Sequence, residues 1–165
     1  MGTDYQIKYN EVLAKFEEAK KYYNEIVNKT NELRQINEAI IEVCNINVYK
    51  TKQYLDYRYS TLNNEKNYKI RECNDKLNEA LSKAFDIADD ETNNGIFPQN
   101  SSGVKVATVI LLYIGINNIE WQCSVDVKMK LSKLVNKGAN FTEIQRQYNC
   151  LWQSIWNNGN SYFYR

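Results

Sequence analysis

Histidine is absent from this 165-residue sequence, and proline occurs only once. Without histidine there is no Ser-His-Asp or Cys-His nucleophile system, no His-ligated zinc and no imidazole proton shuttle. A single proline and 6 glycines favour long regular elements over a turn-rich β sandwich. The longest apolar run, residues 104–116, is interrupted by Lys105 and Thr108. It is shorter than the roughly 20 apolar residues that cross a bilayer, so we expect no membrane span.

Excess charge of one sign is also missing. Lys and Arg number 21 against 20 Asp and Glu, which leaves a formal net charge of +1. Phosphate binding usually requires a clear basic excess, so the balance argues against a nucleic-acid partner. The length and the 43% hydrophobic content are ample for one hydrophobic core. We therefore expect one helical domain over residues 1–165.

Two long amphipathic segments fill the first half, residues 1–90. Apolar residues recur every three or four positions over residues 4–43, with a weak point at 28–31, and again over 48–88. Asn63-Asn64 predicts a kink or break in the second segment, because Asn side chains compete with helical backbone bonding. Oppositely charged residues four apart predict solvated helix faces in both segments. These pairs are Glu11/Lys15, Glu17/Lys21, Glu65/Lys69, Glu72/Lys76 and Glu79/Lys83.

The second half begins with a loop over residues 91–103, which is indicated by its Asn, Gly, Pro and Ser residues. Residues 104–116 are rich in β-branched side chains and could form a strand. Because no partner strand is visible, we favour a buried helix. Residues 119–135 and 140–158 then predict a helical hairpin about Gly138, with Asn140 and Glu143 as a capping box. The expected fold is all-α, an elongated bundle of about five helices.

The four cysteines are widely spaced, at Cys44, Cys73, Cys123 and Cys150. The spacing fits no zinc site, and an even count favours two disulfides in an oxidising compartment. Four buried free thiols are the alternative. In a hairpin about Gly138, Cys123 and Cys150 lie at about the same level, so they form the best pair.

Pairing Cys44 with Cys73 follows by elimination, and it needs the chain to turn back near Asn63-Asn64. If the second helix is unbroken, Cys44 and Cys73 lie too far apart for a bond. Each of them would then have to reach the C-terminal half of the chain.

Three Asn-x-Ser/Thr triplets, at Asn28, Asn100 and Asn140, are candidate glycosylation sites. Together with the disulfides they predict a secreted, extracellular protein whose signal peptide has been removed.

Candidate binding residues gather toward the C-terminus. Lys128, Lys130, Lys133 and Lys137 form a basic stripe that could meet an anionic lipid surface, or simply be a solvated helix face. Three aromatic residues in a row near the C-terminus would promote aggregation if they were exposed, so we expect them to bind another surface. They are Tyr162, Phe163 and Tyr164.

Two further groups of side chains call for partners. Four acidic residues end the second helix, where negative charge opposes the helix dipole. They either have positively charged partners or remain there at a small cost in stability. They are Asp86, Asp89, Asp90 and Glu91. Five tyrosines exceed what one buried face can hold, so some must be exposed, where they suit partner binding. They are Tyr49, Tyr54, Tyr57, Tyr59 and Tyr68. The sequence presents no credible catalytic set, metal site or cofactor motif.

The four cysteines in long amphipathic segments, the Lys-, Asn- and Tyr-rich faces, and the ending Cys150-Leu-Trp-Gln-Ser-Ile-Trp together resemble small secreted helical proteins of insects, including salivary effectors of blood feeders. Apicomplexan surface proteins share the Asn, Lys and Tyr bias. The resemblance implies a non-enzymatic role in binding a host protein, a lipid mediator or a membrane surface, as in immune modulation.

The predicted function is therefore that of a secreted, non-enzymatic binding protein that engages an extracellular protein or receptor. The long apolar stripe of residues 4–43 would favour a homodimer if it continued beyond intramolecular packing. One alternative is a carrier of a small hydrophobic ligand or lipid, held between residues 104–116 and the C-terminal aromatics. A second alternative is an intracellular helical scaffold, if the cysteines are reduced.

Overall fold

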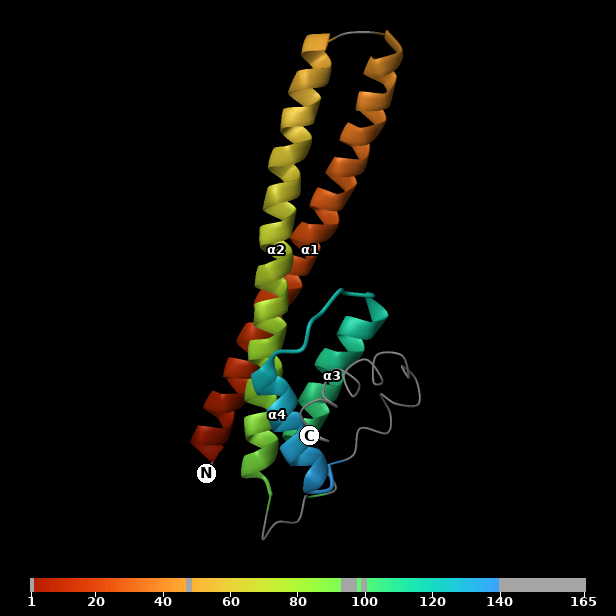
Figure 1. Ribbon diagram of the computed structural model, residues 1–165. Coiled ribbons are helices and arrows are strands. Elements are labelled where there is room, and N and C mark those ends of the chain that lie inside the picture. The colour runs from red at the N-terminus through yellow and green to blue at the C-terminus, as the bar shows by residue number, and fades with distance from the viewer. Residues whose placement is uncertain (1, 47–48, 93–97, 99–100, 140–165) are drawn as a thin grey trace. The chain divides into compact units, whose positions relative to one another are not determined.

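The computed structural model describes residues 2–46, 49–92, 98 and 101–139 (Figure 1). Four helices lie in these ranges: α1 (Gly2–Ile46), α2 (Tyr49–Asp90), α3 (Ser102–Ile116) and α4 (Val125–Asn136). No strand occurs in the described ranges, so the all-α prediction is confirmed and residues 104–116 are helical. The fifth helix expected over residues 140–158 lies outside the described residues. None of the four helices is long and apolar enough to span a membrane.

Both long helices continue through the asparagines that predict weak points. α1 runs without interruption past residues 28–31, and α2 past Asn63-Asn64, so these two predictions are wrong. An Asn costs a helix only about 0.7 kcal/mol relative to Ala. Burial of neighbouring side chains outweighs that cost, because Leu33 and Leu62 are almost fully buried and each is worth about 2 kcal/mol.

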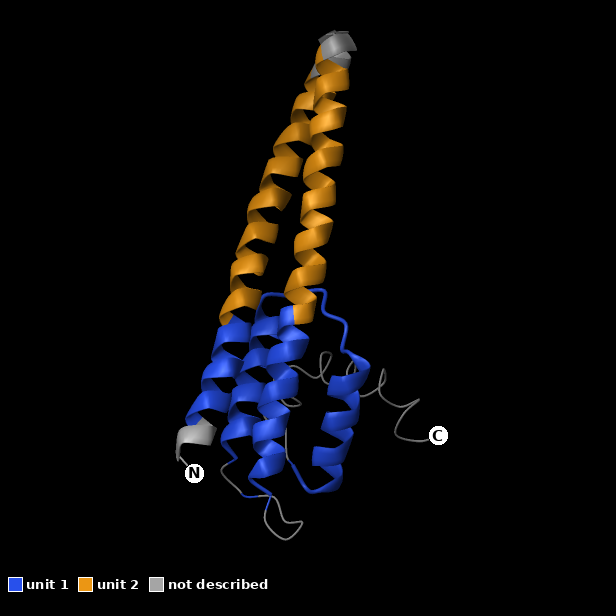
Figure 2. Ribbon diagram, turned by 90° about the vertical axis from the view of Figure 1, so that its left-hand side faces the viewer, with its two compact units in different colours: residues 1–16, 76–165 blue, residues 17–75 orange. Residues whose placement is uncertain are grey.

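The chain divides into two compact units, which Figure 2 colours separately. We call residues 17–75 the hairpin unit and residues 1–16 with 76–165 the bundle unit. α1 and α2 each contribute residues to both.

The hairpin unit consists of two antiparallel helical segments. Lys29 Nζ lies 2.6 Å from Glu65 Oε2, and Lys69 Nζ lies 2.9 Å from Glu25 Oε2. A step of four residues back along α1 is thus matched by a step of four forward along α2, which defines the antiparallel register. Few side chains are fully buried between the two segments. Among the described apolar residues of this unit these are Ala19, Leu33, Leu62 and Cys73.

The bundle unit has the larger core, to which all four helices contribute. Phe16 of α1 meets Tyr113 of α3 edge to face, with ring centroids 5.3 Å apart. α3 crosses α2 closely at Gly103, where a Cβ atom would lie 2.3 Å from the Ala88 amide nitrogen. The largest fully buried side chains are Phe85, Leu77, Leu81, Ile110, Leu111, Ile114, Leu131, Leu134, Val12 and Val127.

α3 ends at Ile116, and the helix predicted over residues 119–135 does not follow it directly. Asn118 adopts φ 53°, and the Ile119 amide donates to the Ile114 carbonyl at 3.0 Å while the Asn118 amide donates to Gly115 at 3.1 Å. These two bonds form a Schellman motif, which satisfies the last carbonyls of the helix. The expected helix from residue 119 is therefore wrong at its start, and α4 begins at Val125 behind the N-cap Ser124.

The predicted stop at Lys137-Gly138 is confirmed. Gly138 adopts φ 97°, its amide donates to the Val135 carbonyl at 3.0 Å, and the Ala139 amide donates to Leu134 at 2.9 Å. This is a second Schellman motif, and its left-handed position suits glycine, which has no Cβ to clash.

Candidate interaction surface

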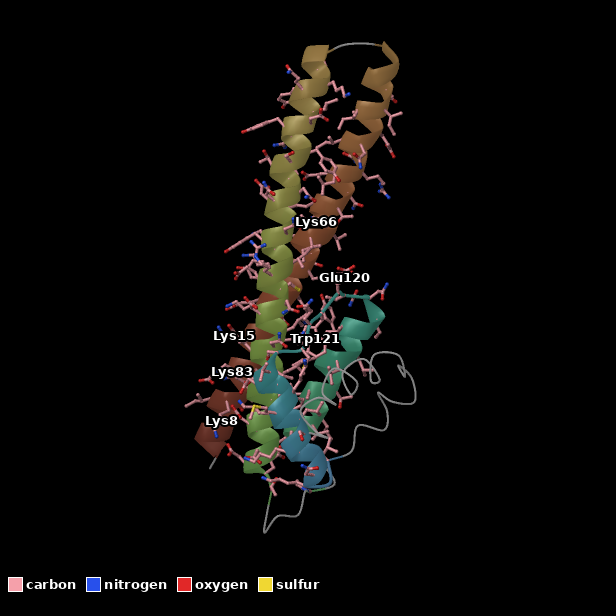
Figure 3. The ribbon with its side chains drawn as sticks, viewed as in Figure 1. Lys8, Lys15, Lys66, Lys83, Glu120 and Trp121 are labelled. Carbon is pink, nitrogen blue, oxygen red and sulfur yellow. The ribbon has the colours of Figure 1, made fainter. Side chains whose placement is uncertain are left out.

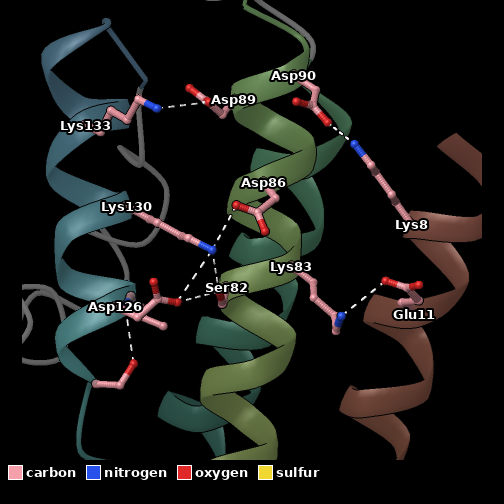
Figure 4. A network of polar contacts seen from close by, with 12 residues as sticks. Lys8, Glu11, Ser82, Lys83, Asp86, Asp89, Asp90, Asp126, Lys130 and Lys133 are labelled. Carbon is pink, nitrogen blue, oxygen red and sulfur yellow. Dashed lines mark hydrogen bonds and ion pairs between the residues drawn. The ribbon is translucent and has the colours of Figure 1, made fainter. Parts of the chain in front are cut away.

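The basic stripe predicted on α4 is engaged within the bundle unit. Lys130 Nζ lies 2.9 Å from Asp86 Oδ1 and 3.5 Å from Asp126 Oδ2, and it donates to Ser82 Oγ at 2.7 Å (Figure 4). Desolvation alone would lower the pKa of Lys130, but the bonds to Asp86 and Asp126 outweigh it and raise the pKa. Through Asp86 and Ser82, Lys130 holds α4 against α2.

Asp89 joins the next two lysines of the stripe to α2. Lys133 Nζ lies 3.2 Å from one oxygen of Asp89, and Lys137 Nζ lies 2.5 Å from the other. The hydrogen bond from Lys137 is the main cause that lowers the pKa of Asp89, with Lys133 adding to it against desolvation. Asp90 pairs with Lys8 of α1. The acidic end of α2 thus has the partners that its position against the helix dipole requires.

Glu91 has a different partner, the start of α3. Its carboxylate accepts hydrogen bonds from the backbone amides of Ser102 and Gly103, both at 2.9 Å, and from the hydroxyl of Ser101 at 3.0 Å. An anion at a helix N-terminus satisfies unpaired amides and complements the dipole. The acidic run at residues 86–91 therefore fastens α1, α3 and α4 to α2 rather than forming a cation site.

The lowered pKa of Asp89 predicts how acid affects stability. A carboxyl group whose folded pKa lies below its unfolded value stabilises the fold above the unfolded pKa, and this contribution is lost as pH falls through the folded pKa. Asp89→Asn should therefore be less stable than wild type near pH 7, by roughly 0.5–1 kcal/mol because the pair is partly solvated. Its stability should fall less steeply below about pH 4.

Urea unfolding curves at neutral pH and near pH 3 measure this difference, with the exposed Asp75→Asn as the matched control. Equal loss of stability on acidification in wild type and Asp89→Asn would contradict the role of Asp89.

Three of the five predicted Glu/Lys pairs have ion-pair partners on the other long helix. They are Glu11/Lys15, Glu65/Lys69 and Glu79/Lys83. In the bundle unit Lys83 Nζ lies 3.2 Å from Glu11 and Lys15 Nζ lies 3.3 Å from Glu79; Figure 3 labels Lys15 and Lys83 on their two helices. In the hairpin unit Glu65 forms an ion pair with Lys29, and Lys69 forms one with Glu25. These positions flank the seam between α1 and α2, so their side chains reach across it. The side chains of these residues are partly solvated, and each also contacts the opposite helix.

Trp121 is held by a side chain that sequence reasoning missed. Its indole N–H donates to Asn78 Oδ1 at 3.0 Å, and the Ser124 amide donates to the same oxygen at 3.2 Å. The Asn78 amide group in turn donates to the Gln122 carbonyl at 3.0 Å. Asn78 is one of the two buried polar residues in the described ranges, and it organises the segment between α3 and α4. The available signal was an asparagine on the apolar face of the helix, three residues before Leu81 and seven before Phe85.

The hairpin unit presents tyrosines to solvent, as the sequence predicts. Tyr54, Tyr57 and Tyr68 are 64%, 71% and 48% exposed, whereas Tyr59 is half-buried. Their spacings of 3, 11 and 14 residues place all three within one narrow face of α2, about 21 Å long. We call these three residues the tyrosine stripe.

Charged groups beside the tyrosine stripe are already paired. Lys69 Nζ lies 5.1 Å from the ring centroid of Tyr22 and 5.9 Å from that of Tyr68, within cation–π range. The hydrogen bond to Glu25 raises the pKa of Lys69, and the hydrogen bond from Lys29 lowers the pKa of Glu65. A shallow groove of about 560 Å³ runs here. Its lining is polar and charged, consisting of Lys29, Asn64, Glu65, Tyr68 and Lys69.

The cysteines do not support the Cys44–Cys73 pairing. Cys73 is a buried free thiol that donates to the Ala19 carbonyl at 3.4 Å, and burial raises its pKa to about 11. Cys44 lies about 25 residues beyond Ala19 in the same unbroken helix, which places it about 37 Å away along the axis. Because α2 does not turn back at Asn63-Asn64, these two cysteines cannot meet.

The remaining predicted residues are placed as follows. Cys123 is a half-buried free thiol whose pKa is raised to about 12 by burial, against the opposing charge of Lys128. Lys128 is half-buried, and Asn28 is exposed on α1. No group of three or more metal-ligating side chains occurs in the described part of the chain. Outside it lie Asn100, Asn140, Cys150, Tyr162, Phe163 and Tyr164.

Comparison with known proteins returned no family model, no curated protein and no solved structure that matches this chain.

Proposed function

We propose that this chain is a secreted, non-enzymatic binding protein that engages an extracellular protein through the tyrosine stripe of its hairpin unit. The observation that carries the proposal is the exposure of three tyrosines on one face of α2. Tyrosine supplies a large, rigid, amphipathic contact area at low entropic cost, and it is enriched in protein interfaces and their hot spots.

The charges around the stripe support a protein partner over a lipid surface. Glu25, Lys29, Glu65 and Lys69 are neutralised in pairs across the hairpin, so a partner does not have to desolvate isolated charges to reach Tyr68. On α4, Lys130, Lys133 and Lys137 are held by Asp86 and Asp89, which weakens the case for an anionic membrane. The charged lining of the groove likewise does not favour a hydrophobic ligand.

Binding to a panel of purified extracellular domains, measured by biolayer interferometry, tests the proposal. We expect wild type to bind at least one domain with micromolar or tighter affinity, and Tyr54→Ala with Tyr57→Ala to weaken binding about tenfold or more, since hot-spot tyrosines contribute about 2 kcal/mol each. Asp56→Ala and Asn67→Ala, at exposed positions of the same helix, are the matched controls. Binding that survives loss of the tyrosines, or no binding by wild type, would contradict the proposal.

A second candidate is the same binding role inside the cell. It is favoured by Cys73, which is a core thiol with no cysteine of α1 within reach. Intact mass of the protein, alkylated in denaturant with and without prior reduction, separates the two: disulfides support secretion, and four alkylated thiols without reduction support the intracellular role.

A further inference from the structure

The groove in the hairpin unit, beside Tyr68, is large enough for a small molecule. Its volume of about 560 Å³ lies within the roughly 300–1,000 Å³ of ligand sites. All of its lining residues belong to the hairpin unit, Lys29 on α1 and Asn64, Glu65, Tyr68 and Lys69 on α2. We call it the Tyr68 groove. The charge, the hydrogen-bonding groups and the aromatic surface of this lining restrict the ligand that it can take.

Ion pairs neutralise the charges that line the Tyr68 groove. Lys29 Nζ lies 2.6 Å from Glu65 Oε2. Lys69 Nζ lies 2.9 Å from Glu25 Oε2, so each ammonium group is matched by one carboxylate. An anionic ligand that approaches either lysine also approaches the carboxylate beside it, and the repulsion offsets the attraction. The groove therefore disfavours anions.

Lys69 also occupies the position that a cationic ligand would take. Its Nζ lies 5.1 Å from the ring centroid of Tyr22 and 5.9 Å from that of Tyr68, within cation–π range of both rings. A positively charged ligand would have to displace Lys69 from the two rings and from Glu25 at once. The groove therefore disfavours cations as well.

The hydrogen-bonding groups that remain open in the groove include both donors and acceptors. Asn64 and Tyr68 are exposed, and neither side chain hydrogen-bonds to another described residue. The Asn64 amide offers a carbonyl acceptor and an NH₂ donor, and the Tyr68 hydroxyl donates and accepts. Glu65 keeps lone pairs beyond its bond to Lys29. This mixture suits ligand hydroxyl groups, whereas an aliphatic ligand would leave these groups without partners.

Tyr68 adds an aromatic surface to the polar lining. The residue is 48% exposed, so a large part of it lies open to a ligand. The flat face of a tyrosine ring packs well against other flat surfaces that are weakly polar. A sugar ring has such a surface, made of its C–H groups, and carries hydroxyl groups around its edge. A neutral sugar thus combines the three properties that the groove favours: no charge, an apolar face and many hydroxyl groups.

We propose that the Tyr68 groove binds a short neutral oligosaccharide, with one sugar ring packed on Tyr68 and its hydroxyl groups bonded to Asn64 and Glu65. Because the groove is shallow, much of the ligand stays in water, and we expect a Kd of about 1 mM. The site goes beyond the protein contact proposed for Tyr54 and Tyr57, and it does not depend on that contact.

Titration of the full-length protein with purified sugars, followed by two-dimensional NMR, tests the proposal. The neutral probes are lactose, mannotriose, cellotriose and triacetylchitotriose. Sialyllactose and deacetylated chitotriose are the anionic and cationic counterparts of the first and last. We expect at least one neutral sugar to bind and to shift the side-chain amide resonances of Asn64. Neutral sugars should bind at least roughly fivefold more tightly than their charged counterparts. Added salt should change the Kd little, because it screens only interactions between charges.

Substitutions in the groove make the test specific. Tyr68→Ala should weaken binding roughly tenfold, because the packing surface is lost. Tyr68→Phe keeps the ring and should weaken binding less. Asn64→Ala should weaken binding roughly fivefold through lost hydrogen bonds. Asn67→Ala, at an exposed position of the same helix outside the groove, is the matched control and should leave the Kd unchanged. Circular dichroism confirms that each variant is folded.

Three outcomes would overturn the proposal. They are the absence of binding by every neutral sugar of the panel, tighter binding of the charged counterparts, and a Kd that Tyr68→Ala and Asn64→Ala leave unchanged. The second outcome would show that the groove recognises charge, and the third that the sugar binds elsewhere on the chain. The panel of extracellular domains measures protein binding separately, so failure of one proposal is distinguishable from failure of the other.

Discussion

Replacing Gly103 by valine is expected to lower the free energy of unfolding by about 3 kcal/mol, because an overpacked helix crossing must move apart. A Cβ atom at residue 103 would lie 2.3 Å from the Ala88 amide nitrogen, 2.5 Å from the Ala84 carbonyl oxygen and 2.7 Å from the Ala88 Cα. All three are backbone atoms, so no side-chain rotamer of α2 can relieve the contact. Moving α3 outward would also strain the bonds from Glu91 to the amides of Ser102 and Gly103.

Gly103→Ala should also lower the free energy of unfolding, but by less than Gly103→Val. Alanine gains up to about 1 kcal/mol over glycine in helix propensity, which offsets part of the clash. Urea unfolding followed by circular dichroism measures both variants, with Lys105→Ala on the exposed side of α3 as the control. Because the clash is with backbone, Ala88→Gly should not rescue Gly103→Val. Wild-type stability of Gly103→Val, or its rescue by Ala88→Gly, would contradict the close crossing.

The helical content of this chain could be predicted because its strongest signal is local. Apolar spacing over residues 4–43 and 48–88 matches α1 and α2, and the absence of a partner strand for residues 104–116 correctly favours helix. The stop at Gly138 was also predictable, since a glycine after the last periodic residue is typical of a C-cap.

The errors arose where tertiary contacts outweigh local preference. Asn63-Asn64 remains helical because packing across the α1–α2 seam outweighs a weak propensity. Conversely, residues 119–124 fit an amphipathic pattern but leave the helix, because Asn118 accepts a left-handed conformation and Asn78 binds the backbone that follows. Spacing alone shows neither which face meets a neighbour nor which asparagine will be buried.

The same limit applies to the candidate site. The sequence correctly indicated exposed tyrosines, because their number exceeds the capacity of one buried face. It could not show that the α4 lysines have carboxylate partners on α2, since the partners lie more than 40 residues away and are brought together only by the fold. Charge stripes on a helix therefore indicate binding surfaces only after intramolecular partners are known.

Asn78→Leu is expected to lower the free energy of unfolding by about 3 kcal/mol, because three polar groups of the segment between α3 and α4 lose their partner at once. These are the indole N–H of Trp121, the amide of Ser124 and the carbonyl of Gln122. Leucine has a similar volume, so the core of the bundle unit keeps its packing and the lost hydrogen bonds dominate the effect. For a chain of this length, such a loss corresponds to a fall in Tm of about 6–12 °C.

A local measurement distinguishes this role of Asn78 from general loss of stability. Hydrogen exchange at the Ser124 amide should accelerate in Asn78→Leu even under conditions where the protein is folded, because this amide no longer has an acceptor. The amide of Val127 should stay protected, since it bonds to the N-cap hydroxyl of Ser124 rather than to Asn78. Asn67→Leu, at an exposed position of the same helix, should change neither exchange nor Tm by more than a small amount. Unchanged protection at Ser124 in Asn78→Leu would show that another group holds this segment in place.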